Sequence, residues 1–397
     1  MNRNDFALLD QNIIYFDNGA TTLKPKILAQ TISDYYNNYS ANAHRGDYDI
    51  SLKVDEKYEE TRQLVKKFIN ANSIDEIAFT SGTTDSINKI IFGYYKYTLK
   101  ENDEILLTKS EHASNVLPWF ELAEELKLKI KYIELDENLK LSIDNFKKSL
   151  TENTKVVSIA HITNVVGDIR PIKEITKIAH EHNIDVMIDG AQSVPHIKID
   201  VKDLDIDFLT FSAHKMCGPT GVGVIYGKYE KLKNIKPIEF GGGMNSSFSN
   251  DGTREYNTLP QLLEAGTPNI AGVIGFGAII KYLENIGMEN IHRYEKELRD
   301  YAIEKLSNLK NIIIYNENSE SGIIAINYKN IFAQDLAIYL NKYNICVRAG
   351  NHCAKILKDD LNIKNTCRIS LYFYNTKEEI DILINALKNE KILDEII

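Results

Sequence analysis

Between about residues 74 and 226, short apolar runs alternate with segments that place apolar residues at helical spacing. The apolar runs predict buried strands at 105–107, 155–160, 185–188, 208–211 and 221–226. The segment at 172–182 is typical of the helices expected between them. Strands and helices in alternation predict a mostly parallel sheet that is covered on both faces, with ligands bound at the carboxyl ends of its strands.

The C-terminal part of the chain repeats this pattern on a smaller scale. Glycines and a proline between Gly241 and Pro268 predict a loop-rich bridge, and a long helical stretch is expected over about 270–309. Strands are expected near 323–327, 345–348 and 366–373, with a last helix from about Lys377. We therefore expect a large domain at residues 15–280 and a small one at 281–397, with residues 1–14 packed on the small domain and the site between the two.

Composition narrows the functional classes. The 397 residues carry a net charge of −9, which argues against an extended surface for nucleic acid. The longest apolar stretch, 270–280, is too short to span a bilayer, and residues 1–12 contain no apolar signal core. We expect a cytoplasmic protein without a membrane partner, in which the four cysteines are free thiols and no metal is bound.

Two charged residues stand at the ends of predicted strands. Lys215 follows the run 208–211 in the turn Ser212-Ala213-His214-Lys215, and Asp189 ends the run 185–188. A pyridoxal phosphate (PLP) enzyme needs such a pair: the lysine amine forms a Schiff base with the cofactor aldehyde, and the carboxylate keeps the pyridine nitrogen protonated. An acid at the end of an apolar strand is costly unless it has a cationic partner.

Other polar residues fit the same cofactor. Gly82, Thr83 and Thr84 follow the strand-like run 77–79 and open a helix near Asp85, which suits a phosphate. Alone, this turn is more often a simple helix cap, but its pairing with Lys215 favours the phosphate. After the run 105–107, His112 is placed to stack on the pyridine face, and Gln192 to donate to the phenolic oxygen of the ring.

A cysteine near the C-terminus suggests the reaction. Cys353 lies on a polar loop that follows the strand ending in Arg348, and the nearby Arg348 and His352 are expected to favour its thiolate. Cys346 and Cys367 lie in apolar strands, and Cys217 lies in a tight turn with little reach, so these three are expected to be structural. Arg368 starts a strand, where a guanidinium facing a cleft is a natural clamp for an amino-acid carboxylate.

Together these motifs resemble the cysteine desulfurases of the class V aminotransferase family, specifically their SufS-like (group II) branch. The matching segments run over nearly the whole chain: Tyr15-Phe16-Asp17-Asn18-Gly19-Ala20, Ala43-His44-Arg45-Gly46, Gly82-Thr83-Thr84, Glu111-His112, Asp189-Gly190-Ala191-Gln192, Ser212-Ala213-His214-Lys215, Ala265-Gly266-Thr267-Pro268 and Arg348 to Ala354. Two positions depart from the pattern: Asn351 replaces a second histidine, and Lys355-Ile356-Leu357 lacks the usual Gln-Pro.

The resemblance implies a type I PLP-transferase fold and a role for each matching residue. Lys215, Cys353 and His112 would be catalytic. The residues implied to bind the cofactor are Gly82, Thr83, Thr84, His112, Asp189, Gln192, Ser212, His214, Lys215 and Thr267. Those implied at the substrate are Asn164, Arg348, Arg368 and His44, the last on the pocket rim. Thr267 would reach the phosphate of the other subunit, which implies a homodimer with a shared active site.

The implied activity converts L-cysteine to L-alanine and leaves a persulfide on Cys353. Its sulfur would pass to a SufE- or SufU-like acceptor protein that supplies iron–sulfur cluster assembly. Selenocysteine lyase and an aminotransferase of the same family remain alternatives, as does a PLP-binding regulator without activity. A metal- or thiol-binding protein using Cys346, His352, Cys353 and Cys367 is disfavoured, because their spacing does not suit a compact tetrahedral site.

Overall fold

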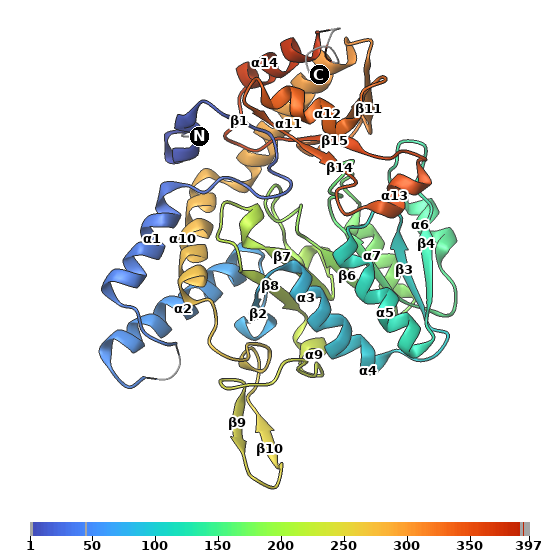
Figure 1. Cartoon of the computed structure of the whole chain (residues 1–397). Helices are drawn as coiled ribbons and strands as arrows, with labels where there is room; N and C mark the ends of the chain where they lie inside the picture. Colours follow the sequence, from blue (N-terminus) through green and yellow to red (C-terminus); the bar gives the residue numbers. More distant parts are fainter. Residues whose placement is uncertain (1–2, 44–45, 390–391, 393–397) are drawn as a thin grey trace.

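A seven-stranded sheet forms the centre of the computed structural model, which describes residues 3–43, 46–389 and 392 (Figure 1). Its strands follow the order β2-β8-β7-β6-β5-β3-β4. Their bounds are Ile77–Thr80 (β2), Glu104–Thr108 (β3), Lys129–Ile133 (β4), Thr154–Ala160 (β5), Asp185–Asp189 (β6), Phe208–Ser212 (β7) and Gly223–Gly227 (β8). Only β8 runs antiparallel to its neighbours, so the prediction of a mostly parallel sheet is confirmed. All five strands predicted in this region are present, although β8 begins at Gly223 rather than at residue 221.

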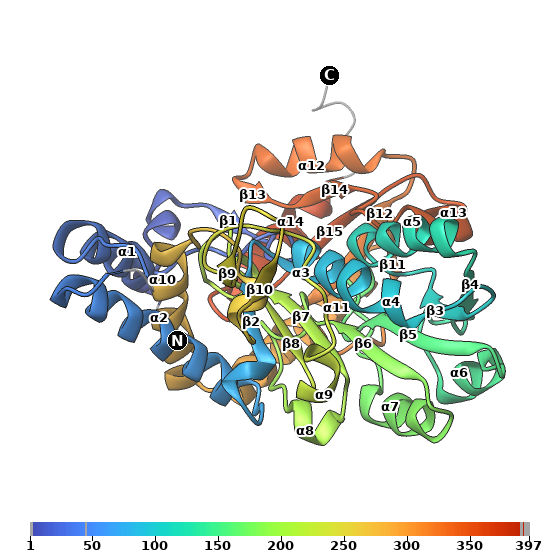
Figure 2. The same cartoon turned by 90° about the horizontal axis from the view of Figure 1, so that it is seen from below.

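Each face of this sheet packs into its own hydrophobic core. In β3, Ile105 and Leu107 belong to the core that α3 (Thr83–Ile90) and α5 (Leu117–Leu126) complete, whereas Leu106 belongs to the core on the other face. The second face is covered by four helices (Figure 2), which are α2 (Asp49–Phe68), α6 (Ile143–Ser149), α7 (Ile172–Glu181) and α10 (Ile270–Ile286). The strands therefore read as continuous apolar runs because both of their faces are buried.

Helices cover the sheet between its strands. Their bounds are Lys26–Asn38 (α1), Asp49–Phe68 (α2), Thr83–Ile90 (α3), Lys96–Thr98 (α4), Leu117–Leu126 (α5), Ile143–Ser149 (α6), Ile172–Glu181 (α7), Val201–Leu204 (α8) and Tyr229–Leu232 (α9). The helix predicted at 172–182 is thus found as α7. A π-helical stretch, Ile91–Tyr95, joins α3 to α4.

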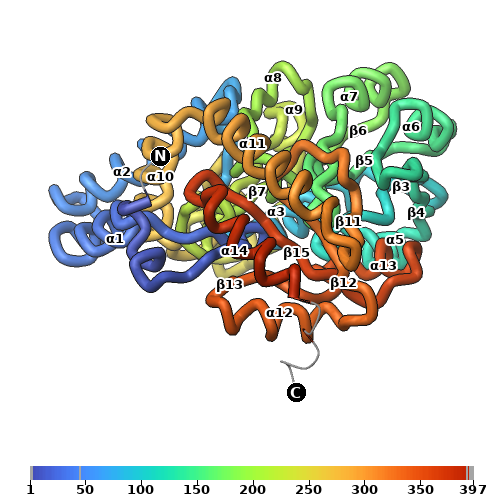
Figure 3. Tube along the Cα trace, turned by 90° about the horizontal axis from the view of Figure 1, so that it is seen from above, coloured from blue at the N-terminus to red at the C-terminus, as the bar shows by residue number. Residues whose placement is uncertain are grey.

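A second, antiparallel sheet lies in the C-terminal part of the chain, in the order β11-β12-β15-β14. Its strands are Ile312–Tyr315 (β11), Ile323–Tyr328 (β12), Arg348–Gly350 (β14) and Thr366–Ser370 (β15). The helices beside it are Met288–Ser307 (α11), Ala333–Asn341 (α12), Lys355–Asp360 (α13) and Lys377–Leu387 (α14). Figure 3 shows these elements along one side of the molecule, next to the N-terminal segment. The predicted smaller α/β pattern is confirmed, whereas the domain limits at residues 280 and 281 stay a prediction.

The N-terminal segment is joined to the C-terminal part by backbone pairing. The short strand β1 (Ile14–Tyr15) pairs in parallel with β13 (Ile345–Cys346). The strand predicted at 345–348 is therefore divided, because Ile345 and Cys346 pair with β1 while the chain from Arg348 onward pairs with β15. The strand predicted at 366–373 ends at Ser370, after which the aromatic residues 372–374 join the core of the large sheet.

Two further predictions need correction. The single long helix expected at 270–309 is two helices, α10 (Ile270–Ile286) and α11, which meet at 71° where Gly287 adopts a φ of 88°. The loop-rich bridge contains a hairpin of β9 (Asn245–Phe248) and β10 (Arg254–Tyr256), which projects from the body of the protein (Figure 1). Within the described residues, no single helix is long and apolar enough to cross a membrane, and only the bent α10–α11 pair meets that test by length and composition.

Candidate active site

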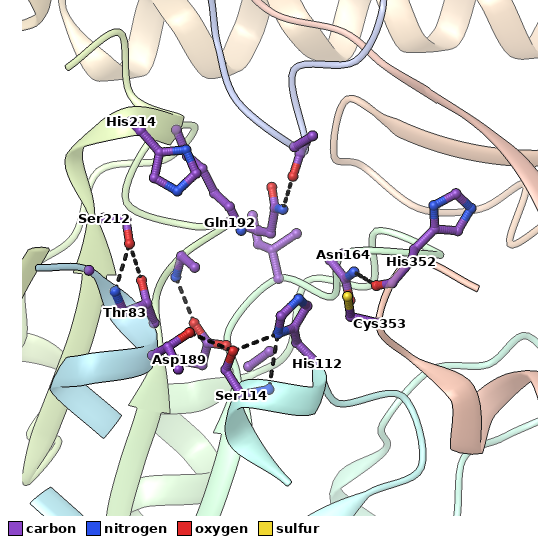
Figure 4. Close-up of a pocket in the computed structure, with 18 of the residues that line it drawn as sticks. Thr83, His112, Ser114, Asn164, Asp189, Gln192, Ser212, His214, His352 and Cys353 are labelled. Atoms are coloured by element: carbon purple, nitrogen blue, oxygen red, sulfur yellow. Dashed lines mark hydrogen bonds between the residues drawn. The ribbon is translucent and has the colours of Figure 1, made fainter. Parts of the chain in front are cut away.

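A cavity of about 520 Å³ lies where the carboxyl ends of the central strands face the C-terminal part of the chain (Figure 4). It brings together nearly all of the residues predicted from the sequence: Gly82, Thr83, Thr84, His112, Asn164, Asp189, Gln192, Ser212, His214, Lys215, Arg348, Cys353 and Arg368. Thr267 does not line this cavity and is exposed. His44 lies outside the described residues.

One end of the cavity is built from the start of α3 and the end of β7. Gly82 is the N-cap of α3, which begins at Thr83, two residues before the predicted start. The Thr83 backbone N–H donates to the Ser212 hydroxyl at 2.7 Å, and the two hydroxyls lie 2.6 Å apart. A Cβ on Gly223 would lie 2.5 Å from the Cα of Gly82, so the strands and the turn pack too closely for a side chain there. Hydroxyls at a helix N-terminus fit a phosphate group.

The floor of the cavity holds a buried carboxylate. The Oδ1 atom of Asp189 accepts a hydrogen bond from the Ala191 N–H at 2.9 Å, and burial raises the pKa of Asp189 while Lys215 opposes that rise. Next to it, the Gln192 amide donates to the Gly19 carbonyl at 2.7 Å, and its Oε1 is buried without a partner. A buried acid beside an unsatisfied amide fits a polar ring that carries a protonated nitrogen, as PLP does.

Lys215 and His112 face this floor from two different loops. Burial lowers the pKa of the Lys215 amine to about 8, an effect that Asp189 opposes and Arg368 reinforces. The Nδ1 atom of His112 accepts the Ser114 backbone N–H at 3.1 Å, which leaves its proton on Nε2. Burial, together with Lys215 and Arg368, lowers the pKa of His112 to about 4, so the ring is neutral at pH 7 and free to stack on a cofactor ring.

Two arginines on the other side of the cavity share one carboxylate. Arg348 donates to both oxygens of Asp17 at 3.1 to 3.2 Å, and Arg368 donates to Oδ1 of the same residue at 3.1 Å. Arg368 is buried, also donates to the Asn164 carbonyl at 3.0 Å, and has an unpartnered Nε. Sequence reasoning assigned no role to Asp17, although it directly follows the apolar run 13–16 and so carries the strand-end signal that pointed to Asp189.

The loop that carries Cys353 is held over the cavity by its backbone. The Cys353 carbonyl accepts the Ala113 N–H and the His352 carbonyl accepts the Asn164 amide, each at 2.7 Å (Figure 4). His352 and Cys353 have φ values of 55° and 58°, a left-handed conformation that costs energy outside glycine. Ala354 is packed with Val165 and Val166 in a small hydrophobic cluster below the loop. The thiol of Cys353 is therefore exposed on a loop with a fixed position.

The expectation that His352 favours the thiolate is wrong. Its Nε2 lies 3.0 Å from both oxygens of Thr366, and burial, aided by Arg368 and Lys358, lowers its pKa to about 3. His352 is thus a neutral anchor of the loop, and it supplies no positive charge to the thiol. Arg348 pairs with Asp17, which it shares with Arg368, so one carboxylate faces two guanidinium groups.

The remaining cysteines are placed as predicted. Cys217 and Cys367 are fully buried, and burial raises the pKa of each to about 12. Cys346 is partly buried, and burial raises its pKa as well. In the part of the chain that the structure describes, no group of three or more His, Cys, Asp and Glu side chains is arranged to hold a metal ion.

Comparison with known proteins agrees with this geometry. The family model for class-V aminotransferases matches residues 14–383. A relative from Halalkalibacterium halodurans, named a probable cysteine desulfurase, is 42% identical over 391 residues, which is 97% of this chain and 96% of the relative. An apo cysteine desulfurase from Thermococcus onnurineus NA1 has a TM-score of 0.93 and 37% identity, covering 97% of this chain and 96% of its own. The cysteine desulfurase CsdA from Escherichia coli has a TM-score of 0.92 and 32% identity, covering 100% and 98%. The predicted fold class is confirmed.

Proposed function

The chain belongs to the class-V aminotransferase family, and from that premise we propose that it is a PLP-dependent cysteine desulfurase. It converts L-cysteine to L-alanine and keeps the sulfur as a persulfide on Cys353. The observation that carries this proposal is the exposed thiol of Cys353, which lines the same cavity as Lys215 and Asp189. A fold of this family can use that cavity for several reactions. The thiol at the cavity is a nucleophile that can accept sulfur, and it therefore favours sulfur transfer over the other reactions.

The residues that would hold PLP fall into two groups. The hydroxyl-rich end, with Thr83, Thr84, Ser212 and His214, would bind the phosphate, and Asp189, Gln192 and His112 would surround the ring. Lys215 would attach to the aldehyde. When bound, PLP withdraws electrons from the substrate α-carbon and so acidifies its proton.

The substrate carboxylate would bind to Arg368, Arg348 and Asn164. The guanidinium of Arg368 is well placed for this because one nitrogen, Nε, has no partner within the described structure. Asp17 pairs with both arginines here, which leaves one positive charge uncompensated among the three side chains. A single substrate carboxylate would therefore neutralise the clamp.

Lys215 would move the protons of the substrate. Because burial lowers its pKa to about 8, a substantial fraction of the amine is neutral near physiological pH and can accept the α-proton. The same amine then returns a proton to the carbon skeleton. His112 remains neutral at that pH and would orient the ring by stacking.

Cys353 would take the sulfur. Its thiolate forms an S–S bond with the sulfur of the substrate while the substrate C–S bond breaks, and the carbon skeleton leaves as L-alanine after it gains a proton. Two hydrogen bonds to the loop, one from the Ala113 backbone N–H and one from the Asn164 side-chain amide, hold the thiol on the cavity side. The persulfide then needs an external thiol, which we propose is carried by a SufE- or SufU-like protein that supplies iron–sulfur cluster assembly.

We also propose that the enzyme is a homodimer. Thr267 is exposed and does not line the cavity of its own subunit, as a residue that reaches the phosphate of a second subunit would require. Its loop follows Glu264, whose side chain is largely covered and forms an ion pair with Arg62 at 2.7 Å. The rim position proposed for His44 lies outside the described residues.

The test is Cys353→Ala in the holoenzyme, with Cys346→Ala as the matched control. We expect C353A to keep the visible absorbance of lysine-bound PLP and to lose sulfide and alanine formation from L-cysteine. C346A should keep both. Sustained desulfuration by C353A would contradict the proposal. Comparing the turnover of L-cysteine and L-selenocysteine by the wild type separates this activity from that of a selenocysteine lyase, which would favour the selenium substrate.

A further inference from the structure

We propose that Thr22 and Lys24 are positioning residues for Lys215: they hold the peptide group between His214 and Lys215 and so direct the Lys215 side chain into the cavity. The inference rests on the proposed function of Lys215. Neither Thr22 nor Lys24 lines the cavity, so their effect on the reaction would pass through this backbone alone.

The carbonyl oxygen of His214 is surrounded by donors from one short segment of the chain. It lies 3.1 Å from the Thr22 backbone nitrogen, 3.0 Å from the Thr21 hydroxyl, 3.1 Å from the Thr22 hydroxyl and 2.7 Å from the Lys24 ammonium. A carbonyl oxygen has two lone pairs, so four donors saturate it from all accessible sides. The orientation of the peptide plane that leads into Lys215 is therefore fixed.

Thr22 also closes the far side of the same turn. Its hydroxyl accepts the backbone N–H of Cys217 at 2.7 Å while it contacts the His214 carbonyl. Cys217 has a φ of 63°, a left-handed conformation that needs support in a residue with a side chain. One hydroxyl thus bridges the residues on both sides of Lys215 and Met216.

Lys24 is an unusual choice for a purely structural contact. Its ammonium donates to the carbonyls of Thr22 and His214, each at 2.7 Å, and to the Thr21 hydroxyl at 3.3 Å. Among the described residues, no carboxylate forms an ion pair with it, and burial lowers its pKa to about 8. A partly buried cation satisfied only by dipoles stabilises a fold poorly. We therefore assign Lys24 the role of orienting the His214 carbonyl through this short, charge-assisted hydrogen bond.

The experiment compares Thr22→Val and Lys24→Met with two matched controls in the holoenzyme. Thr22→Ser keeps the hydroxyl. Lys26→Met removes an exposed lysine of the same segment, whose ammonium only reaches the Asn4 carbonyl. The readout is exchange of the α-proton of L-alanine in D₂O, followed by NMR, because this exchange needs Lys215 but not Cys353. The KM for L-cysteine, the melting temperature and the visible PLP absorbance are recorded in parallel.

We expect T22V and K24M to slow this exchange by about 10- to 100-fold, since small misplacements of a catalytic group cost that much. The KM for L-cysteine should change by less than about threefold, because the carboxylate clamp is untouched. T22S and K26M should exchange at the wild-type rate. Exchange at the wild-type rate in both T22V and K24M would overturn the inference, as would equal slowing in T22S or K26M.

Failure of this inference and failure of the proposed function give different results. If wild-type protein shows no PLP absorbance or no exchange, the proposed function fails. If wild-type protein exchanges and the two variants match it, only the role of Thr22 and Lys24 fails. Should T22V not fold, K24M carries the test, because methionine keeps the length and the apolar stem of the lysine.

Discussion

The backbone N–H of Ala113 donates to the carbonyl of Cys353 at 2.7 Å, which ties the nucleophile loop to the residue that follows His112. The thiol and the imidazole belong to Cys353 and His112, which are 241 positions apart in the sequence, yet this hydrogen bond links their two loops directly. Ala113 is the first residue of a short 3-10 helix whose N-cap is His112, so its N–H is not used within that helix.

This bond can be removed with little other change by Ala113→Pro. Proline is tolerated at the first position of a helix, and the extended backbone of His112, with φ −69° and ψ 146°, suits the residue before a proline. We expect desulfuration by A113P to fall by about tenfold or more, because the loop carrying Cys353 is displaced. The α-proton exchange of L-alanine should be unchanged. Ala113→Ser keeps the N–H and is the control; an equal loss of both activities in A113P would show damage to His112 instead.

Asp17 pairs with both arginines that we propose would bind the substrate carboxylate. In Asp17→Asn the buried guanidinium of Arg368 loses its counter-charge, and we expect the ligand-free protein to lose on the order of 3 kcal/mol of unfolding free energy. L-alanine should then raise the melting temperature of D17N more than that of the wild type, because its carboxylate replaces the missing charge. Asp360→Asn, in the exposed pair with Lys109, is the control. An equal thermal shift in D17N and wild type would contradict this account.

The lowered pKa of Lys215 predicts how the apoenzyme takes up PLP. Only the neutral amine attacks an aldehyde, and burial moves its pKa from 10.5 to about 8, so the neutral fraction rises as the pH passes through 8. We expect the rate of formation of the visible absorbance to rise up to about pH 8 and then level off. N-acetyl-lysine, with a pKa of about 10.4, is the reference and should keep accelerating to higher pH. A rate in the apoenzyme that climbs steadily to pH 10 would count against a desolvated Lys215.

A buried lysine next to the nucleophile loop gives a stability prediction. Lys358 is buried, donates to the Thr366 hydroxyl at 2.7 Å, and burial lowers its pKa from 10.5 to about 8. Below pH 8 the unfolded chain binds this proton more tightly than the folded one, which costs the folded state about 3 kcal/mol. That cost disappears as the pH rises from 8 to 10.5, because the unfolded chain then loses the proton as well.

Lys358→Met should therefore be more stable than the wild type at pH 7, and its advantage should shrink as the pH approaches 10.5. Urea unfolding at a series of pH values measures the difference. Lys355→Met removes an exposed lysine of the same helix and should show no such trend. A stability difference for K358M that is independent of pH would contradict the assignment.

The architecture and most of the site were predictable because their signals are local. Buried parallel strands read as apolar runs, and Asp189, His112 and Lys215 each follow one of them. The division of the strand at 345–348 was not predictable, since it depends on which partner each half meets in space. The break at Gly287 does have a local signal, since a glycine interrupts the helical pattern at that position.

The contacts that determine the charges of the site residues could not be predicted from the sequence. His352 stands next to Cys353 in the chain, yet its ring turns to Thr366, which comes from β15. Asp17 pairs with arginines more than 300 residues away, as the separations of 331 and 351 residues show. Such partners are fixed by tertiary packing, and a pattern along the chain cannot identify them.

The central claim is that Cys353 accepts the sulfur of L-cysteine. Holoenzyme treated with L-cysteine in the absence of a reducing thiol, then alkylated and digested, should carry the mass of one added sulfur atom on the peptide that contains Cys353. The peptides of Cys217 and Cys367, both fully buried, should stay unmodified. Added sulfur on Cys353 alone is the predicted result, and alanine formation with no sulfur on Cys353 would contradict the account.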